Sequence, residues 1–167
     1  VEKVSWDEAI KFCEKLTQTE KEAGRLPEGW TYTLPTEAQW EYACRAGTTT
    51  AYFFGDTITP KQANYARNVG KTTPVGTYPA NAWGFHDIHG NVVEWCLDWY
   101  GKYPDGSVID PVGPSVGSIR VYRGGGWANY GRSMRSADRG RNAPDTRFIY
   151  LGFRLSLQTE KKERSDP

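Results

Sequence analysis

The stretch LPTEAQWEYACRAG, Leu34–Gly47, carries the signals that begin and end one helix. Thr36 is placed to cap the first turn, and a glutamine three residues later closes a capping box around the free amide groups. Trp40 and Cys44 recur at helical spacing and therefore share one face. Gly47 follows, where a glycine commonly ends a helix. The stretch predicts a short helix with one apolar face.

The same device occurs earlier, in SWDEAIKFCEKL. Ser5 and Glu8 are spaced as a capping box, so a helix is expected to begin here. Apolar residues then follow at helical spacing: Trp6, Ala9, Ile10, Cys13 and Leu16. This pattern predicts a second helix of about a dozen residues.

After Gly47 the helical periodicity gives way to glycine, proline, asparagine and threonine with scattered aromatic residues. Short extended segments are expected at TPVGTY, VVEWCLDWY, IRVYRGG and LGFRLSL. We expect residues 1–157 to form one domain whose second half is loops held on a small sheet. The polar tail QTEKKERSDP, residues 158–167, has the composition of a disordered segment.

The composition narrows the classes of function. The 167 residues carry a net charge of +1, so no overall field favours nucleic acid or a membrane surface. Seven tryptophans and an aromatic content of 14% indicate large rings that fill a loop-rich interior or line a binding face. The three cysteines are far apart and form no disulfide framework, which favours a reducing compartment and a cytoplasmic location.

The segment Arg123–Arg154 is rich in glycine, arginine and aromatic residues, yet it contains no Cys, His, Glu or Lys. The usual agents of thiol, acid–base or metal chemistry are therefore missing from it. The use of arginine instead of lysine indicates hydrogen bonds from the planar, forked guanidinium group, and not a need for positive charge alone. The consecutive glycines after Arg123 lack the Lys-Ser/Thr ending of a phosphate loop and more readily allow close backbone passage beside Trp127.

Two readings of GFHDIHGNVVEW stay open at this point. His86 and His89 lack the further ligands of a zinc site, but Asp87, Glu94 and turn carbonyls are oxygen ligands of the kind that calcium prefers. The alternative is a turn in which Asp87 and Asn91 cap backbone amides, and the local sequence favours this turn. For Asp98 and Asp105, farther along, the sequence indicates no partner and favours roles in turns and at the surface.

Six motifs occur in one order: VSWDEA, LPTEAQWEYACRAG, GNVVEWCLDWY, RVYRGGGW, RSADRGRN and LGFRLSL. In this order and spacing the chain resembles the formylglycine-generating enzyme, or sulfatase-modifying factor, family from Val4 to about Leu157. The resemblance implies an α+β, C-type-lectin-like fold with two helices, a small twisted antiparallel sheet and extensive irregular loops. Family members usually have a further N-terminal portion that this sequence does not include. We therefore expect the chain to be one piece of a larger or cleaved protein.

The family enzymes oxidise a sulfatase cysteine with copper held by two cysteines just after the R-G-G motif. Those positions fall on Asn129 and Met134, and neither residue can act as a thiolate. The resemblance thus implies no copper and no formylglycine synthesis. Two further family cysteines align with Cys13 and Cys44, but their disulfide partners align with Leu155 and Ser136, so both thiols should be free and buried.

The resemblance also implies a structural calcium ion held by the Asp87 and Glu94 side chains and the Gly90 and Val92 carbonyls. This outweighs the local preference for a simple turn. A second family calcium site would begin at Asn64 and the Tyr65 carbonyl, but the loop that follows is shorter and its acidic ligand is missing.

The function expected from the resemblance is a non-catalytic domain that binds a protein or peptide ligand through Arg123–Tyr150. Some family members are variable proteins of diversity-generating retroelements, and this chain is a candidate for that group. The expected ligand-facing residues are Trp127, Asn129, Tyr130, Arg132, Phe148 and Tyr150, whereas Arg135, Arg139 and Arg154 are expected to be internal tethers. The alternatives are a related enzyme with altered chemistry and a structural module of a larger assembly.

Overall fold

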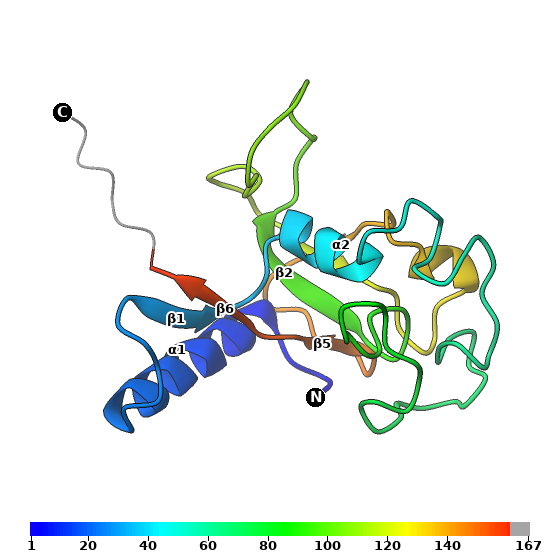
Figure 1. Ribbon diagram of the computed structural model, residues 1–167, viewed down its shortest axis with the longest axis horizontal. Coiled ribbons are helices and arrows are strands. Elements are labelled where there is room, and N and C mark those ends of the chain that lie inside the picture. Colours follow the sequence, from blue (N-terminus) through cyan, green and yellow to red (C-terminus); the bar gives the residue numbers. More distant parts are fainter. Residues whose placement is uncertain (161–167) are drawn as a thin grey trace.

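The computed structural model describes residues 1–160 and has the expected α+β architecture, with two helices, two small sheets and long loops (Figure 1). The helices are α1 (Trp6–Glu22), α2 (Glu37–Arg45) and the 3-10 turn η1 (Gly131–Met134). The strands are β1 (Trp30–Thr33), β2 (Val93–Trp99), β3 (Arg120–Arg123), β4 (Gly140–Asn142), β5 (Leu151–Phe153) and β6 (Ser156–Thr159).

Both helices begin at the capping boxes that the sequence predicts. The Ser5 hydroxyl accepts the Glu8 N–H and the Glu8 carboxylate accepts the Ser5 N–H, and Thr36 opens α2 with Gln39 in the same reciprocal way. Helix α1 has 17 residues and is longer than expected. Helix α2 ends on Ala46, which itself takes the left-handed conformation at φ 45°.

Strand β2 is the centre of a four-stranded sheet with the order β4-β3-β2-β5. It runs antiparallel to β3 but parallel to β5, so the expectation of a purely antiparallel sheet is wrong for that pair. Strands β1 and β6 form a separate antiparallel pair. The TPVGTY segment forms loop and turn instead of a strand, while β1 and β4 were not expected.

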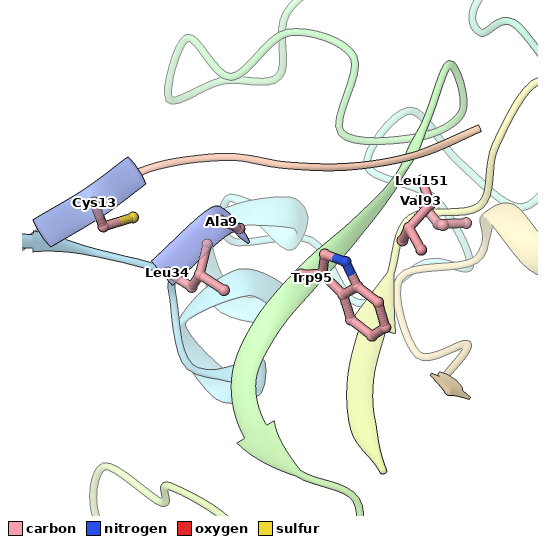
Figure 2. Packing of buried hydrophobic residues seen from close by; sticks show 6 residues of the cluster. All are labelled: Ala9, Cys13, Leu34, Val93, Trp95 and Leu151. Carbon is pink, nitrogen blue, oxygen red and sulfur yellow. The ribbon is translucent and has the colours of Figure 1, made fainter. Parts of the chain in front are cut away.

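Two apolar clusters hold these elements together. One lies between α1 and the sheet and comprises Ala9, Cys13, Leu34, Val93, Trp95 and Leu151 (Figure 2). The other lies between α2 and strands β2 and β3 and comprises Trp40, Cys44, Ile88, Cys96 and Val121. All three cysteines are buried and free, as expected for Cys13 and Cys44.

The C-terminal boundary of the folded domain differs from the expected one. The expected disordered tail begins too early, because Gln158 and Thr159 pair with Thr31 and Trp30 in the β1–β6 sheet. The rest of that expectation, residues 161–167, lies outside the described residues.

The segment between β2 and β3 projects from the body of the molecule (Figure 1). None of the helices within residues 1–160 is long and apolar enough to cross a membrane.

Candidate functional site

The site is built on the glycine loop that follows β3. Gly124 and Gly125 both have positive φ, at 90° and 67°, which favours glycine on conformational grounds. A Cβ atom on Gly125 would lie 2.6 Å from the sulfur of Met134, and one on Gly124 would lie 2.9 Å from the Trp40 ring. These contacts let the loop pass directly over the core and present the following residues at the surface.

The two positions that would hold copper in the family enzymes are used structurally here. Asn129 closes a turn: its Oδ1 accepts the Gly126 N–H at 2.9 Å, and its own N–H donates to the Gly126 carbonyl at 2.8 Å. Its carbonyl accepts the Ala66 N–H at 2.7 Å, which ties the turn to another loop. Met134 is fully buried beneath Gly125. Asn129 has no sulfur and the Met134 thioether is buried, so neither side chain offers a sulfur ligand at the surface.

Three of the expected ligand-facing rings lie together. Phe148 stacks on Tyr150 with ring centroids 5.4 Å apart, and Trp127 meets Tyr150 edge to face at 6.5 Å. Phe148 and Tyr150 are half-buried and also pack against the α1 cluster, so they serve the core as well as the surface. Trp127 donates its indole N–H to the Ile149 carbonyl at 3.2 Å, which fixes the ring. We call these three rings the aromatic ridge.

The remaining expected residues are more exposed. Tyr130 keeps 72% of its surface exposed, and Arg132 is exposed on η1. The structure places neither side chain in a ring contact with the aromatic ridge. A polar cavity of about 230 Å³ opens nearby, and its lining includes Asn129, Ser133 and Asp138. The expected residues thus divide into the aromatic ridge, the exposed Tyr130 and Arg132, and Asn129 in the cavity lining.

The arginine tethers are partly those expected. Arg139 makes a forked pair with the buried carboxylate of Glu37, with both N–O distances 2.6 Å. Arg154 makes a similar pair with Glu94, at 2.5 and 2.8 Å. Arg135 is not an internal tether: it is exposed and only 3.7 Å from Asp138. The expectation for Arg135 is therefore wrong.

Sequence reasoning missed the most buried arginine. Arg123 is 1% exposed and bonds the Glu41 carboxylate and the carbonyls of Asp138 and Ser136, the last at 2.8 Å. It joins α2 to the segment after the glycine loop. Only its position directly before the glycines set it apart from the other arginines in the sequence.

His89 is buried in a neutral form under the site. Its Nδ1 lies 2.6 Å from the Met134 carbonyl, and its Nε2 accepts the Phe53 N–H at 3.1 Å. Burial lowers the pKa of His89 to about 4. The Cys44 sulfur lies 3.6 Å from the Ser136 hydroxyl, where the family disulfide would be, and burial raises the pKa of this thiol to about 12. Burial therefore disfavours the charged form of both groups at neutral pH.

The proposed calcium ligands are only partly occupied by protein contacts. Asp87 Oδ2 accepts the Gly76 N–H at 2.7 Å, while its Oδ1 is buried with no hydrogen-bond partner within residues 1–160. Glu94 accepts three N–H bonds, two from Arg154 and one from Trp40, which leaves one lone pair on Oε1. The Gly90 and Val92 carbonyls accept no hydrogen bond from the described loops or side chains. The unpartnered Asp87 Oδ1 and these carbonyls are oxygen ligands of the kind that a hard cation takes, whereas both Glu94 oxygens already face the Arg154 guanidinium.

The second calcium position offers less. Asn64 is fully buried and donates to the Lys71 carbonyl at 2.8 Å, and its Oδ1 has no hydrogen-bond partner in the described part of the chain. The Tyr65 carbonyl, the other expected ligand, already accepts the Asn68 N–H at 3.0 Å. Within residues 1–160, no group of three or more His, Cys, Asp or Glu residues could hold a metal ion.

Comparison with known proteins defines the class. The model of the sulfatase-modifying factor enzyme 1-like domain matches residues 1–159, so the chain belongs to this family. The mouse formylglycine-generating enzyme is 35% identical over 92% of this chain and 42% of its own length. The kinase pkn1 of Chlamydia caviae, a serine/threonine-protein kinase, is 44% identical over 74% of this chain but only 20% of its own length. The chain therefore spans less than half of these relatives.

Among solved structures, the variable protein 1 of Treponema denticola is similar, with a TM-score of 0.82 and 31% identity over 94% of this chain and 70% of that protein. PvdO from Pseudomonas aeruginosa has a TM-score of 0.78 and 28% identity over 95% of this chain and 61% of that protein. These likenesses confirm the expected fold, that of formylglycine-generating enzymes and C-type lectins.

Proposed function

We propose that this domain binds a protein or peptide ligand through Arg123–Tyr150 and does not oxidise cysteine. One observation carries the proposal: the two copper positions hold a turn-closing Asn129 and a buried Met134, while Tyr130 beside them is 72% exposed. Neither position supplies a thiolate for copper, yet the neighbouring surface still presents large side chains. The likeness to the Treponema denticola variable protein supports this direction.

The chemistry of the surface suits a polypeptide ligand. Tyrosine, tryptophan and arginine bury large areas with little flexibility, and they dominate the binding energy of many interfaces. Because the indole N–H of Trp127 is already bonded, this residue offers an apolar ring face. Arg132 forms no ion pair within residues 1–160, so its guanidinium can fork onto a carboxylate of the ligand.

A selection from a random peptide library displayed on phage tests this proposal. We expect enriched peptides to bind the wild-type domain and to lose at least about tenfold in affinity against Tyr130→Ala and Arg132→Ala, because each variant removes an anchor. Phe12→Ala is the matched control, since Phe12 is an aromatic ring 50% exposed on α1. Peptides that bind Tyr130→Ala as tightly as wild type, but fail on Phe12→Ala, would contradict the proposed surface.

We further propose that the segment is diversified, as in variable proteins of retroelements. The support is the exposed position of Tyr130 and Ile149 outside helices and strands, where side chains can change without cost to the core. A near-copy of the coding segment beside a reverse-transcriptase gene is the expected finding. A genomic neighbourhood without such a copy would remove this part of the proposal and leave peptide binding intact.

Calcium at the Asp87–Glu94 loop is proposed as a stabiliser of the fold. An ion that binds only the folded state raises the melting temperature in proportion to the logarithm of its concentration. Asp87→Asn is the suitable variant, because Glu94→Gln would also disrupt the pairs with Arg154 and Trp40. We expect calcium to raise the melting temperature of wild type and of Asp105→Asn, but not of Asp87→Asn. A chelator that leaves wild type unchanged would exclude the ion.

A further inference from the structure

A second cavity contains none of the three rings of the aromatic ridge in its lining. It has a volume of about 380 Å³ and lies between the first turns of α2, the end of β2 and the projecting segment after it. Its size falls within the range of small-ligand sites, which is roughly 300–1,000 Å³.

The walls of this cavity include three aromatic rings and three prolines: Tyr42, Trp99, Tyr103, Pro104, Pro111 and Pro114. Tyr103 is held in place although 59% of it is exposed, because its hydroxyl donates to Glu37 at 3.2 Å and Arg139 stacks 4.0 Å from its ring centroid. A Cβ atom on Gly101 would lie 2.4 Å from Pro114, so the projecting segment folds tightly onto itself. The walls are therefore formed before any ligand arrives.

One carboxylate in this cavity lacks a cation. Glu37 is paired with Arg139, and Glu41 with Arg45 and Arg123. Asp98, also in the lining, is 5% exposed within β2, so the expectation of a turn or surface role is wrong for it, and it forms no ion pair within residues 1–160.

Asp98 does have one structural bond, because its Oδ2 accepts the Glu37 N–H at 2.7 Å at the start of α2. The loop passes close to its other oxygen, since a Cβ atom on Gly113 would lie 3.3 Å from Oδ1. Burial, the largest cause, raises the pKa of Asp98 to about 6, so the group is mostly ionised at neutral pH. A buried negative charge without a cation is unfavourable, and a positively charged ligand would offset that cost.

We propose that this cavity binds an organic monocation, a primary ammonium group on a short apolar stem. The ammonium group pairs with Asp98, and the apolar stem lies against Trp99 and Tyr103. A free alkylamine and the side chain of a lysine in a peptide share this chemistry.

Titration with pentylammonium, followed by amide NMR shifts, tests the proposal. Pentan-1-ol and pentanoate are the matched neutral and anionic probes. We expect pentylammonium to shift the signals of Trp99, Gly101 and Gly113 and to bind at least about tenfold more tightly than either probe. A lysine derivative blocked at both ends, acetyl-lysine methylamide, distinguishes the sources: tighter binding than pentylammonium identifies a peptide lysine, and weaker binding identifies a free amine.

Two variants and one control complete the test. Asp98→Asn keeps an acceptor for the Glu37 N–H and should reduce pentylammonium binding to the level of pentan-1-ol. If this variant fails to fold, Tyr103→Ala removes an exposed wall and should weaken binding several-fold, whereas Phe12→Ala on α1 should leave it unchanged. Equal binding of ammonium and alcohol, unchanged binding by a folded Asp98→Asn, or shifts confined to other parts of the domain would overturn the proposal.

Discussion

At the scale of single residues, Arg123 links three parts of the fold. Its guanidinium is fully buried and bonds Glu41 on α2 and the carbonyls of Ser136 and Asp138 after the glycine loop. A buried ion pair of this kind adds little stability compared with an apolar replacement of both partners. Glu41 would keep Arg45 if Arg123 were removed, but the Ser136 and Asp138 carbonyls would lose their donor and a buried network would be broken, which is costly.

We therefore expect Arg123→Met to lower the free energy of unfolding by about 3–5 kcal/mol. Arg135→Met is the matched control, because the Arg135 side chain is 53% exposed and only weakly paired, and its effect should stay within about 0.5 kcal/mol. Urea denaturation measures both values. Similar losses for the two variants would show that the buried network is not formed.

His89 makes stability depend on pH. Its pKa falls from 6.5 to about 4 on folding because burial disfavours the imidazolium, so the unfolded chain takes up the proton first as the pH falls. The contribution is fully present above pH 6.5 and is lost as the pH falls toward 4, by roughly 3 kcal/mol. Asp98, whose pKa rises from 3.8 to about 6, acts in the opposite direction over the same window.

The difference in unfolding free energy between wild type and His89→Gln isolates the histidine, because Asp98 is common to both proteins. We expect this difference to shrink by roughly 3 kcal/mol between pH 7 and pH 4. Urea denaturation at half-unit steps of pH gives the curve. A difference that is constant with pH would mean that His89 is not buried in the neutral form.

At the scale of elements, the two capping boxes set where the helices begin. Ser5 is 1% exposed and its hydroxyl accepts the Glu8 N–H at 3.2 Å, so Ser5→Ala should cost about 1 kcal/mol of unfolding free energy. Thr19→Ala, on the exposed face of the same helix, should be neutral or slightly stabilising because alanine favours helix. If Thr19→Ala costs as much as Ser5→Ala, the cap does not fix the helix start.

The elements differ in how well the sequence predicts them. The capping boxes at Ser5 and Thr36 are local, so α1 and α2 are predictable from a few adjacent residues. Strands β1 and β4 are short and exist because they pair with β6 and β3, far along the chain, and this pairing leaves no local signal. TPVGTY has strand-like residues but no partner strand in the described fold.

The candidate site, too, was predictable only where its signal is local in the sequence. Trp127, Phe148 and Tyr150 are large rings on a glycine-rich segment, and composition alone indicates a cluster. Which arginine is a tether depends on where α2 and β2 place their carboxylates, so Arg123 and Arg135 could not be told apart by type. The inward turn of Asn129 likewise depends on a hydrogen bond to Gly126.

At the scale of the whole molecule, the helices and sheets support long loops whose side chains are free to serve a ligand. Because Asn129 and Met134 supply no thiolate, we expect no conversion of a sulfatase cysteine peptide to formylglycine in the presence of copper. Mass spectrometry of the peptide measures this, with the formylglycine-generating enzyme of Streptomyces coelicolor, 35% identical over 92% of this chain, as positive control. A thiol-to-aldehyde mass change with this chain alone would show surviving oxidase activity.

The most direct measurement is a hydrogen-exchange footprint of the domain with and without a peptide from the phage selection. The account predicts slower exchange on binding in residues 126–134 and 146–151, which carry Tyr130, Arg132 and the aromatic ridge. Unchanged exchange in both segments, with protection instead at α1 or the β1–β6 sheet, would contradict the claim that this surface binds the ligand.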